Sequence, residues 1–371
     1  MKSIIPAAIA DQSWSAIWFL CALAGIGIAA LYSVAGGAPT PWAAAHAVRF
    51  TMFLVLALVM SYIRPETYKA LMFPALGGSA LLLILVLLIG TIGGGARSWL
   101  NLGFMQVQPS EFAKIALLGV LARYYELLPP GEVRTFRALI PPVLITMVPF
   151  MLIVIQPDLG TAMLLLLSVV ILCFMAGLPL WWFIGSGMAV MIFIPIAYNF
   201  LMMPHQQKRV TIFLNPQDDP LGAGYHISQS FIAIGSGGIW GKGYLQGTQS
   251  HLDYLPEQHT DFIFPAIAEE WGLFGAFLII LLFGLLLRWG MGVAQNARSR
   301  FEQLFAAGLT CSLFLYISIN LMMVTGLAPV VGIPLPLVSY GGSAMLATML
   351  CVGILMSIDR NNRRARHRSD F

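Results

Sequence analysis

The feature that most constrains the fold is a succession of ten apolar runs, each long enough to cross a lipid bilayer. A spanning helix needs about 20 mostly apolar residues, because its backbone polar groups must be satisfied within the helix. The runs cover about residues 15–35, 46–63, 70–91, 111–128, 138–155, 160–177, 181–202, 262–288, 302–327 and 338–358. With 58% hydrophobic and 10% charged residues, the chain is predicted to be an all-α polytopic membrane protein of about ten transmembrane helices. We expect residues 1–371 to form one membrane domain, with an extracytoplasmic loop, 203–261, between helices 7 and 8.

The lysines and arginines of the loops predict which side of the membrane each loop occupies. If the N-terminus is cytoplasmic, fourteen of the twenty basic residues lie on the cytoplasmic side, as the positive-inside rule expects. An even number of helices returns the arginine-rich C-terminus to the same side. The six basic residues left on the outer face are Arg49, Arg97, Lys114, Lys208, Arg209 and Lys242. Because the rule disfavours them there, they indicate an extracytoplasmic site.

The longest polar interval runs from Pro204 to Trp271 and contains Asp261 at the start of the eighth apolar run. Asp261 follows Thr260, a predicted helix N-cap. One interpretation is therefore a first-turn aspartate that stabilises the helix dipole by about 0.3–1 kcal/mol. The other is a general base at the boundary of water and lipid, whose pKa partial desolvation would raise from about 3.9. Spacing alone leaves both interpretations open.

The same interval carries a short amphipathic pattern and a group of glycines. Ile227, Phe231 and Ile234 share one face of a predicted helix, 225–234, that would lie on the membrane surface. Gly235 to Gly243 is rich in glycine, which lets a chain bend tightly or bring amide groups close to an anion.

A second acidic residue opens the fourth run, in Gln108-Pro109-Ser110-Glu111. Ser110 is the predicted N-cap, and Glu111 shares a helix face with Lys114 three residues later. The two form either a local ion pair of a few tenths of a kcal/mol or part of a site that faces a polar cavity. The second interpretation is supported by the cost of placing charge so close to hydrocarbon.

Three more carboxylates lie near the outer ends of apolar runs. Asp158, in a tight turn, is predicted to cap the sixth helix, with a site role as the alternative. Glu269 and Glu270 would lie about 12–14 Å deeper than Asp261 in a straight helix. At that depth their carboxylates would either have a functional role or pair with a polar group on a neighbouring helix.

Several site classes are not supported. Four cysteines lie inside apolar runs without CxxC spacing, so neither a disulfide framework nor a thiolate metal site is indicated. Gly241-Lys242 lacks the glycine that a P-loop requires at position 236, and the six histidines show no HExxH pattern. The net charge of +4 reflects the arginines of the C-terminal tail and does not indicate nucleic-acid binding.

Six motifs, in order along nearly the whole chain, carry a resemblance to a known family. They are Trp99-Leu100-Asn101-Leu102-Gly103, Gln108-Pro109-Ser110-Glu111 with Lys114, Gln156-Pro157-Asp158-Leu159-Gly160-Thr161, Asp219-Pro220-Leu221-Gly222-Ala223-Gly224-Tyr225-His226, His259-Thr260-Asp261-Phe262-Ile263-Phe264, and Pro334-Leu335-Pro336-Leu337-Val338-Ser339-Tyr340-Gly341-Gly342-Ser343. With these motifs the sequence closely resembles the SEDS family (shape, elongation, division and sporulation). The large loop and short N-terminus favour its elongation-specific branch over the division paralogue.

This resemblance implies a peptidoglycan glycosyltransferase that polymerises lipid II into β-1,4 glycan strands during cell elongation, on the outer face of the bacterial inner membrane. The essential aspartate of the family falls on Asp261, the proposed base, and its acidic and basic pair falls on Glu111 and Lys114. Undecaprenyl pyrophosphate would be the leaving group. The predicted substrate-binding residues are Arg49, Arg97, Asp158, Arg209 and Lys242.

Two other functions stay open at this point. A lipid II flippase would need a polar path to the cytoplasmic side, whereas a scaffold of the elongation machinery would need no set of carboxylates and cations. The resemblance implies lipid II and the nascent glycan strand as ligands, and a class B penicillin-binding transpeptidase and other elongation-complex membrane proteins as partners. No nucleic acid, cofactor or metal ligand set is predicted, and the sequence leaves open whether Mg²⁺ or Mn²⁺ assists the pyrophosphate.

Overall fold

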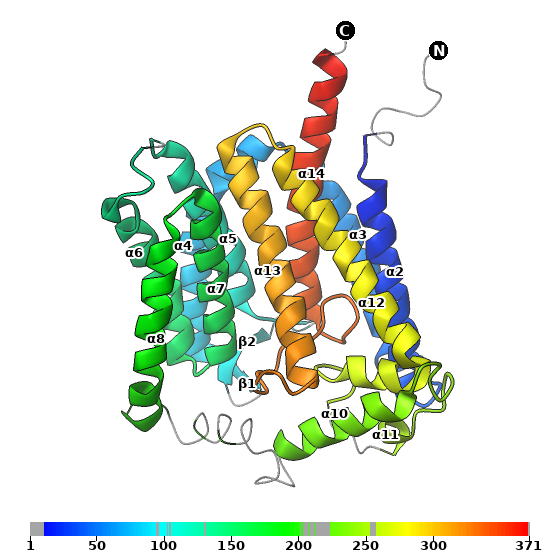
Figure 1. Ribbon diagram of the computed structural model, residues 1–371. Helices are drawn as coiled ribbons and strands as arrows, with labels where there is room; N and C mark the ends of the chain where they lie inside the picture. The colour runs from blue at the N-terminus through cyan, green and yellow to red at the C-terminus, as the bar shows by residue number, and fades with distance from the viewer. Residues whose placement is uncertain are drawn as a thin grey trace, which may run out of the picture.

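In the computed structural model the chain is a bundle of long helices, with a small sheet and further helices at one end (Figure 1). The structure describes residues 11–93, 96–101, 103, 105–129, 131–200, 202, 207, 211, 223–252 and 257–369. The long helices are α2 (Trp14–Val34), α3 (Ala43–Met60), α4 (Pro65–Ile89), α5 (Pro109–Leu127), α6 (Ile140–Ile155), α7 (Leu159–Ala176), α8 (Leu180–Phe200), α12 (Ile263–Gln295), α13 (Arg300–Val324) and α14 (Gly342–Ser369).

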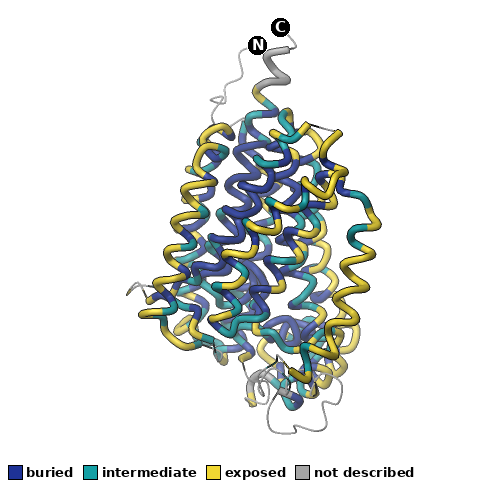
Figure 2. The backbone as a smooth tube through the Cα atoms, turned by 90° about the vertical axis from the view of Figure 1, so that its left-hand side faces the viewer, coloured by how far each residue is buried: buried dark blue, intermediate teal, exposed yellow. Residues whose placement is uncertain are grey.

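Each of the ten predicted runs corresponds to one of these helices, which confirms the fold class. Within the described residues, nine helices are long and apolar enough to cross a membrane. The remaining long helix, α5, spans 19 residues but carries Glu111, Lys114, Arg123 and Glu126. Its charges are tolerated because it lies at the centre of the bundle, packed against α4, α7 and α13. Figure 2 shows this distribution, with buried residues inside and exposed residues at the periphery.

The outer helices expose apolar side chains that water would not tolerate in such numbers. Helix α8 has no buried residue, and its exposed side chains include Ile192, Phe193 and, at 82% exposure, Phe200. A helix that is apolar all round and packs few of its side chains on protein needs an apolar solvent, because exposing that apolar surface to water is unfavourable. The lipid of a bilayer supplies that solvent.

The start of α2 and the end of α14 lie at the same end of the bundle, which we call the terminus end. This agrees with the even number of spans. The opposite end carries the three-stranded antiparallel sheet of β1 (Thr91–Gly93), β2 (Ala96–Asn101) and β3 (Gln106–Val107). It also carries α10 (Ala223–Gly237) and α11 (Thr248–His251), as Figure 1 shows. We call it the loop end.

Helix α10 contains the predicted helix 225–234, but it packs on α12 and α13. Ile227 is buried, and the buried Ser230 hydroxyl donates to the Val324 carbonyl oxygen at 2.6 Å. Phe231 lies half exposed, beside Gly326. The amphipathic pattern therefore predicted the helix correctly, while its inner face is covered by protein.

Helix α12 is not straight, so the predicted depth of Glu269 and Glu270 is wrong. Gly272 has φ 66° and ψ −161° and breaks the helix after its first segment. In that segment Glu269 turns back to the loop end, where its carboxylate accepts from the Lys242 ammonium at 2.6 Å and from the Thr248 amide at 3.0 Å. Glu270 accepts from the Ser33 hydroxyl. Both carboxylates therefore pair with polar groups, which was one of the two interpretations.

The glycines after α10 permit this arrangement. A Cβ added to Gly237 or Gly241 would lie 2.0 Å from a backbone oxygen of α12. The amides of Lys242 and Gly243 donate to the carbonyl oxygens of Glu269 and Glu270 at 2.9 and 3.0 Å. Here the glycines let two backbones approach each other, and the amides bind carbonyl groups of α12.

Candidate active site

Asp261 lies at the loop end, in the turn that leads into α12. The helix begins at Ile263 with Phe262 as N-cap, so Asp261 precedes it and does not occupy its first turn. The Thr260 hydroxyl donates to Glu257 and does not cap the helix. The predicted N-cap and the interpretation as a first-turn aspartate are therefore both wrong, because the chain turns once more before the helix starts.

An amide from α13 holds the Asp261 turn in place. The Asn320 side-chain nitrogen donates to the Asp261 carbonyl oxygen at 3.0 Å and to the Ile333 carbonyl oxygen at 2.6 Å. Asn320 is fully buried, so these bonds are shielded from water. One side chain thereby joins α13, the turn before α12 and the segment that leads into α14.

The Asp261 side chain faces a cavity of about 430 Å³ at the loop end. The cavity lies between the sheet, the first turns of α5 and α7, the turn 257–261, and the segment 330–341. Its polar and aromatic lining comprises Ser98, Trp99, Gln106, Gln108, Asp158, Thr161, Glu257, Thr260, Asp261, Tyr316 and Tyr340. Gly332, with φ +75°, leaves room beside Asp261, since a Cβ there would lie 3.5 Å from its carboxylate oxygen. The cavity is therefore large enough for a sugar-sized ligand against Asp261.

The surroundings of Asp261 raise its pKa to about 7. Burial contributes most, because a desolvated carboxylate favours its neutral form, and the nearby Glu257 carboxylate adds repulsion. A carboxyl group with a pKa near neutrality can hold a proton and release it at physiological pH, as a general base must.

Glu111 and Lys114 form a buried ion pair behind the cavity. The Lys114 ammonium lies 3.0 Å from the Glu111 carboxylate, and the two residues are 3% and 2% exposed. The same ammonium lies 4.8 Å from the ring centroid of Tyr316, a cavity-lining residue. The pair therefore reaches the cavity through Tyr316. Because α5 begins at Pro109 with Gln108 as N-cap, the predicted N-cap at Ser110 is wrong.

Asp158 caps α7, as its position in a tight turn predicted. Its carboxylate accepts from the Thr161 amide at 3.1 Å, the Thr161 hydroxyl at 2.9 Å and the Gln108 side-chain amide at 2.9 Å. All three residues line the cavity. The cap therefore also forms part of the cavity wall, so the two interpretations of Asp158 are compatible.

Arg49 reaches the edge of the cavity from α3. Its guanidinium lies over the ring of Tyr340, 4.6 Å from the centroid, and beside Gly342 at the N-terminus of α14. His259, two residues before Asp261, stacks on Trp42 at 4.5 Å between ring centroids, and burial lowers the pKa of its imidazole. These contacts join the start of α3 to the turn that holds Asp261.

Two other predicted cations that the structure describes, Arg97 and Lys242, do not line the cavity. Arg97 is exposed and donates to the Leu87 carbonyl oxygen at 3.3 Å, whereas its neighbours Ala96 and Ser98 line the cavity. Lys242 binds Glu269, as described above. Lys208 and Arg209 lie outside the described residues. Among the residues that the structure does describe, no three His, Cys, Asp or Glu side chains form a metal-binding group.

Two residues of α13 were missed by sequence reasoning. Tyr316 separates the ion pair from the cavity, and Asn320 holds the Asp261 turn. Both lie inside the predicted run 302–327. Polar side chains within a spanning helix usually have a functional or pairing role, and this signal was present in the sequence.

Comparison with known proteins places the chain in a family context. The family model described as cell cycle protein, covering FtsW, RodA and SpoVE, matches residues 14–364. Peptidoglycan glycosyltransferase MrdB of Escherichia coli K12 is 45% identical over 318 residues, which are 85% of this chain and 85% of that protein.

Solved structures share the fold. A chain from a study of structural coordination of polymerization and crosslinking by a peptidoglycan synthase complex matches with a TM-score of 0.83 at 32% identity, covering 95% of this chain and 98% of that one. The rod shape determining protein RodA of Thermus thermophilus matches with a TM-score of 0.68 at 30% identity, covering 95% and 97%.

The buried ion pair makes a testable prediction. Lys114→Met leaves the Glu111 carboxylate buried without a counter-charge, which should destabilise the fold by about 3–5 kcal/mol. We expect a clear fall in the melting temperature of the purified protein in detergent. The double variant Glu111→Gln/Lys114→Met should recover most of the loss, because neither charge remains. An unchanged melting temperature in the single variant would contradict a buried pair.

Proposed function

The chain belongs to the FtsW, RodA and SpoVE family of cell cycle proteins, and from this premise we propose that it polymerises lipid II with Asp261 as general base. The chain is a peptidoglycan glycosyltransferase, and its similarity to the Escherichia coli glycosyltransferase MrdB and to RodA of Thermus thermophilus, a rod shape determining protein, supports a role in cell elongation. The observation that carries the catalytic assignment is the Asp261 carboxyl group, which has a raised pKa and lines the cavity at the loop end.

The proposed reaction is a single displacement. The Asp261 carboxylate takes the proton from the 4-hydroxyl of the acceptor sugar as its oxygen attacks the anomeric carbon of the donor. The bond from that carbon to the pyrophosphate oxygen breaks, and undecaprenyl pyrophosphate leaves with the bonding electrons. One displacement inverts an α-linked donor to the β-1,4 product. Asp261 ends the step protonated and returns its proton to water.

We assign the departing pyrophosphate to the side of the cavity where Arg49 meets α14. Among the residues that the structure describes, the cavity lining contains three carboxylates, from Asp158, Glu257 and Asp261, and no lysine or arginine. A neutral sugar hydroxyl suits that environment better than a pyrophosphate does. At its edge, Arg49 lies beside Gly342, where the N-terminus of α14 adds the positive end of a helix dipole. These two features would stabilise the charge that develops on the leaving group.

Glu111 and Lys114 are proposed to act on the same cavity through Tyr316. The pair is too deeply buried to meet a ligand that stays within the cavity, but its ammonium lies against the Tyr316 ring. The ion pair would therefore fix the position of the Tyr316 ring in the cavity wall. Its charges would act on a ligand from behind that ring. Asp158 is proposed to position Gln108 and Thr161 for hydrogen bonds with the sugars.

The geometry gives little support to a flippase. That function required a polar path toward the terminus end, for which Glu269 and Glu270 were the candidates. Both carboxylates bind other groups: Glu269 pairs with Lys242, Thr248 and Gln249 at the loop end, and Glu270 pairs with Ser33. A role beside a transpeptidase is compatible with catalysis, and a relative solved in a peptidoglycan synthase complex supports such a partner.

The Asp261 assignment is tested by Asp261→Asn. The amide keeps the size of the side chain but cannot accept the proton, so the rate of glycan polymerisation should fall by about 10²–10⁴. The assay is strand formation from lipid II by the purified protein with its transpeptidase partner, and the melting temperature reports folding. Asp11→Asn, a carboxylate paired with Arg364 at the terminus end, is the matched control and should keep full activity. Full polymerisation by Asp261→Asn would exclude it as base.

The raised pKa predicts an acidic limb in the pH profile. Only deprotonated Asp261 can act as base, so kcat/KM should rise with pH and level off above about pH 7, falling about tenfold per unit well below the pKa. Glu257→Gln removes the repulsion that helps raise this pKa, and the limb should therefore move to lower pH. Glu132→Gln, which changes an exposed carboxylate far from the cavity, should leave the limb in place. If Glu257→Gln leaves the acidic limb at the same pH as in the wild type, Asp261 is not the group whose titration produces the limb.

The pyrophosphate assignment is tested by Arg49→Gln. Loss of one charge-assisted contact to the leaving group should lower kcat/KM for lipid II by about tenfold or more. Arg64→Gln, which removes an exposed arginine at the N-cap of α4, serves as the control for general charge effects. Equal kinetics for the two variants would place the pyrophosphate elsewhere.

A further inference from the structure

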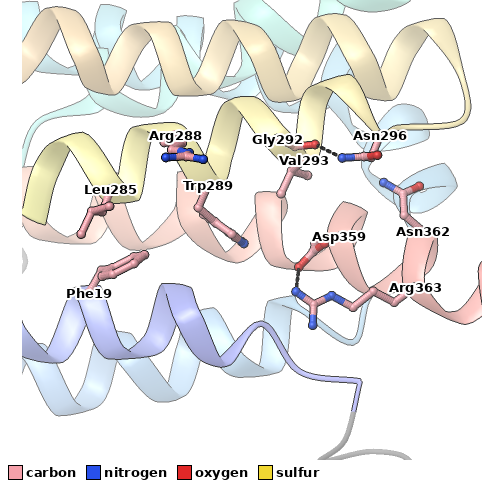
Figure 3. Close-up of a pocket in the computed structure, with 10 residues that line it drawn as sticks. All are labelled: Phe19, Leu285, Arg288, Trp289, Gly292, Val293, Asn296, Asp359, Asn362 and Arg363. Atoms are coloured by element: carbon pink, nitrogen blue, oxygen red, sulfur yellow. Dashed lines mark hydrogen bonds and ion pairs between the residues drawn. The ribbon is translucent and has the colours of Figure 1, made fainter.

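A second cavity lies at the terminus end, away from Asp261, between α2, α12 and α14. Its volume is about 640 Å³. Figure 3 shows that α12 contributes Arg288 and Trp289 and that α14 contributes Asp359, Asn362 and Arg363 to the lining, with Trp289 and Asp359 directed into the space between the two helices. None of these residues takes part in the proposed reaction.

Two polar side chains of this cavity lack partners. The Trp289 indole nitrogen is buried without a hydrogen bond, and so are both polar atoms of the Asn362 amide. Asn362 is only 3% exposed, so its amide is shielded from bulk water. Buried polar groups are nearly always hydrogen-bonded in folded proteins, since an unmade bond is costly. The indole N–H and the amide NH₂ are therefore unsatisfied donors in the wall of a cavity large enough for a ligand.

The charges of the lining favour an anion. The lining contains two guanidinium groups, from Arg288 and Arg363, and one carboxylate, from Asp359, so its net charge is +1. Asp359 is already satisfied, because it accepts from Arg363 at 2.8 Å and from the Ser13 hydroxyl at 2.6 Å. Arg288 is exposed and forms no ion pair with any described residue. Its guanidinium is thus available to an anionic ligand in the cavity.

The cavity lies at the depth of lipid headgroups. Trp14 and Trp18, at 48% and 70% exposure, project from α2 beside the cavity-lining Phe19. Exposed tryptophans of spanning helices gather at the boundary of lipid and water. Phe19 and Leu285 supply an apolar wall next to the cationic and polar groups. The site therefore combines donors for a phosphate with a surface for the first carbons of an acyl chain.

We propose that this cavity binds the phosphate headgroup of an anionic membrane phospholipid from the leaflet at the terminus end. The phosphate accepts hydrogen bonds from Arg288, Trp289 and Asn362, and the acyl chains run along Phe19 and Leu285. Basic pockets between spanning helices are suited to such headgroups. By bridging α12 and α14, the bound lipid would hold together two helices whose other ends border the Asp261 cavity.

The test measures lipid binding to the full-length protein in detergent by native mass spectrometry. The probes are phosphatidylglycerol, a diacylglycerol of the same chains and inorganic phosphate. Phosphatidylglycerol should bind, and Arg288→Gln should weaken it about fivefold, the scale expected for one basic residue at an anionic membrane surface. Trp289→Phe removes the indole N–H together with part of the ring, and should also weaken binding. Arg134→Gln, an exposed arginine in the α5–α6 connection, is the matched control and should bind as the wild type does.

Three results would overturn the proposal. Equal affinities for Arg288→Gln and Arg134→Gln would mean that only general surface charge attracts the lipid. Diacylglycerol binding as tightly as phosphatidylglycerol would mean that the headgroup is not recognised. Inorganic phosphate binding as tightly as phosphatidylglycerol would mean that the acyl wall contributes nothing and the site is not one for a lipid.

Discussion

The low polarity of the bilayer is the constraint on which the rest of the structure depends. Hydrocarbon cannot satisfy a backbone amide or a charge, so the spans are helices and their outward side chains are apolar. Helix α8, exposed along its whole length, meets this requirement most completely. Charged side chains therefore lie in two places. They lie at the ends of the bundle and in the interior around α5, where Glu111 and Lys114 neutralise each other.

The same constraint explains how the loop end acquires a cavity-lining carboxylate with a raised pKa. Asp261 lies where the chain turns from the loop into the buried first segment of α12, so it is partly withdrawn from water while a cavity keeps it accessible. The turn is held from α13 by Asn320, whose amide also binds the segment before α14. The position of the carboxylate and its raised pKa thus depend on packing between three helices.

Several local predictions failed for one shared reason, and others succeeded for its converse. Asp158 was correctly predicted as a cap because a cap is a contact between residues three apart. Thr260 was wrongly predicted as a helix N-cap, since its hydroxyl donates to the Glu257 carboxylate instead. Glu269 was placed too deep because a straight helix was assumed, whereas Gly272 lets α12 break against the glycine-rich loop. Local rules hold until another contact, local as for Thr260 or tertiary as for Glu269, offers the same group a better partner.

The sequence by itself determined the helical class, the ten spans and the residues able to do chemistry, because length, hydropathy and residue type are local properties that lipid selects directly. The motifs also predicted Asp261, Glu111 and Lys114 as site residues before any geometry was known. Only the tertiary structure decided which of these residues meet. It placed Tyr316 between the ion pair and the cavity, and it turned Lys242 away toward Glu269. Such contacts join residues tens to hundreds of positions apart, and helix register and packing, which set them, are not encoded in any single window of sequence.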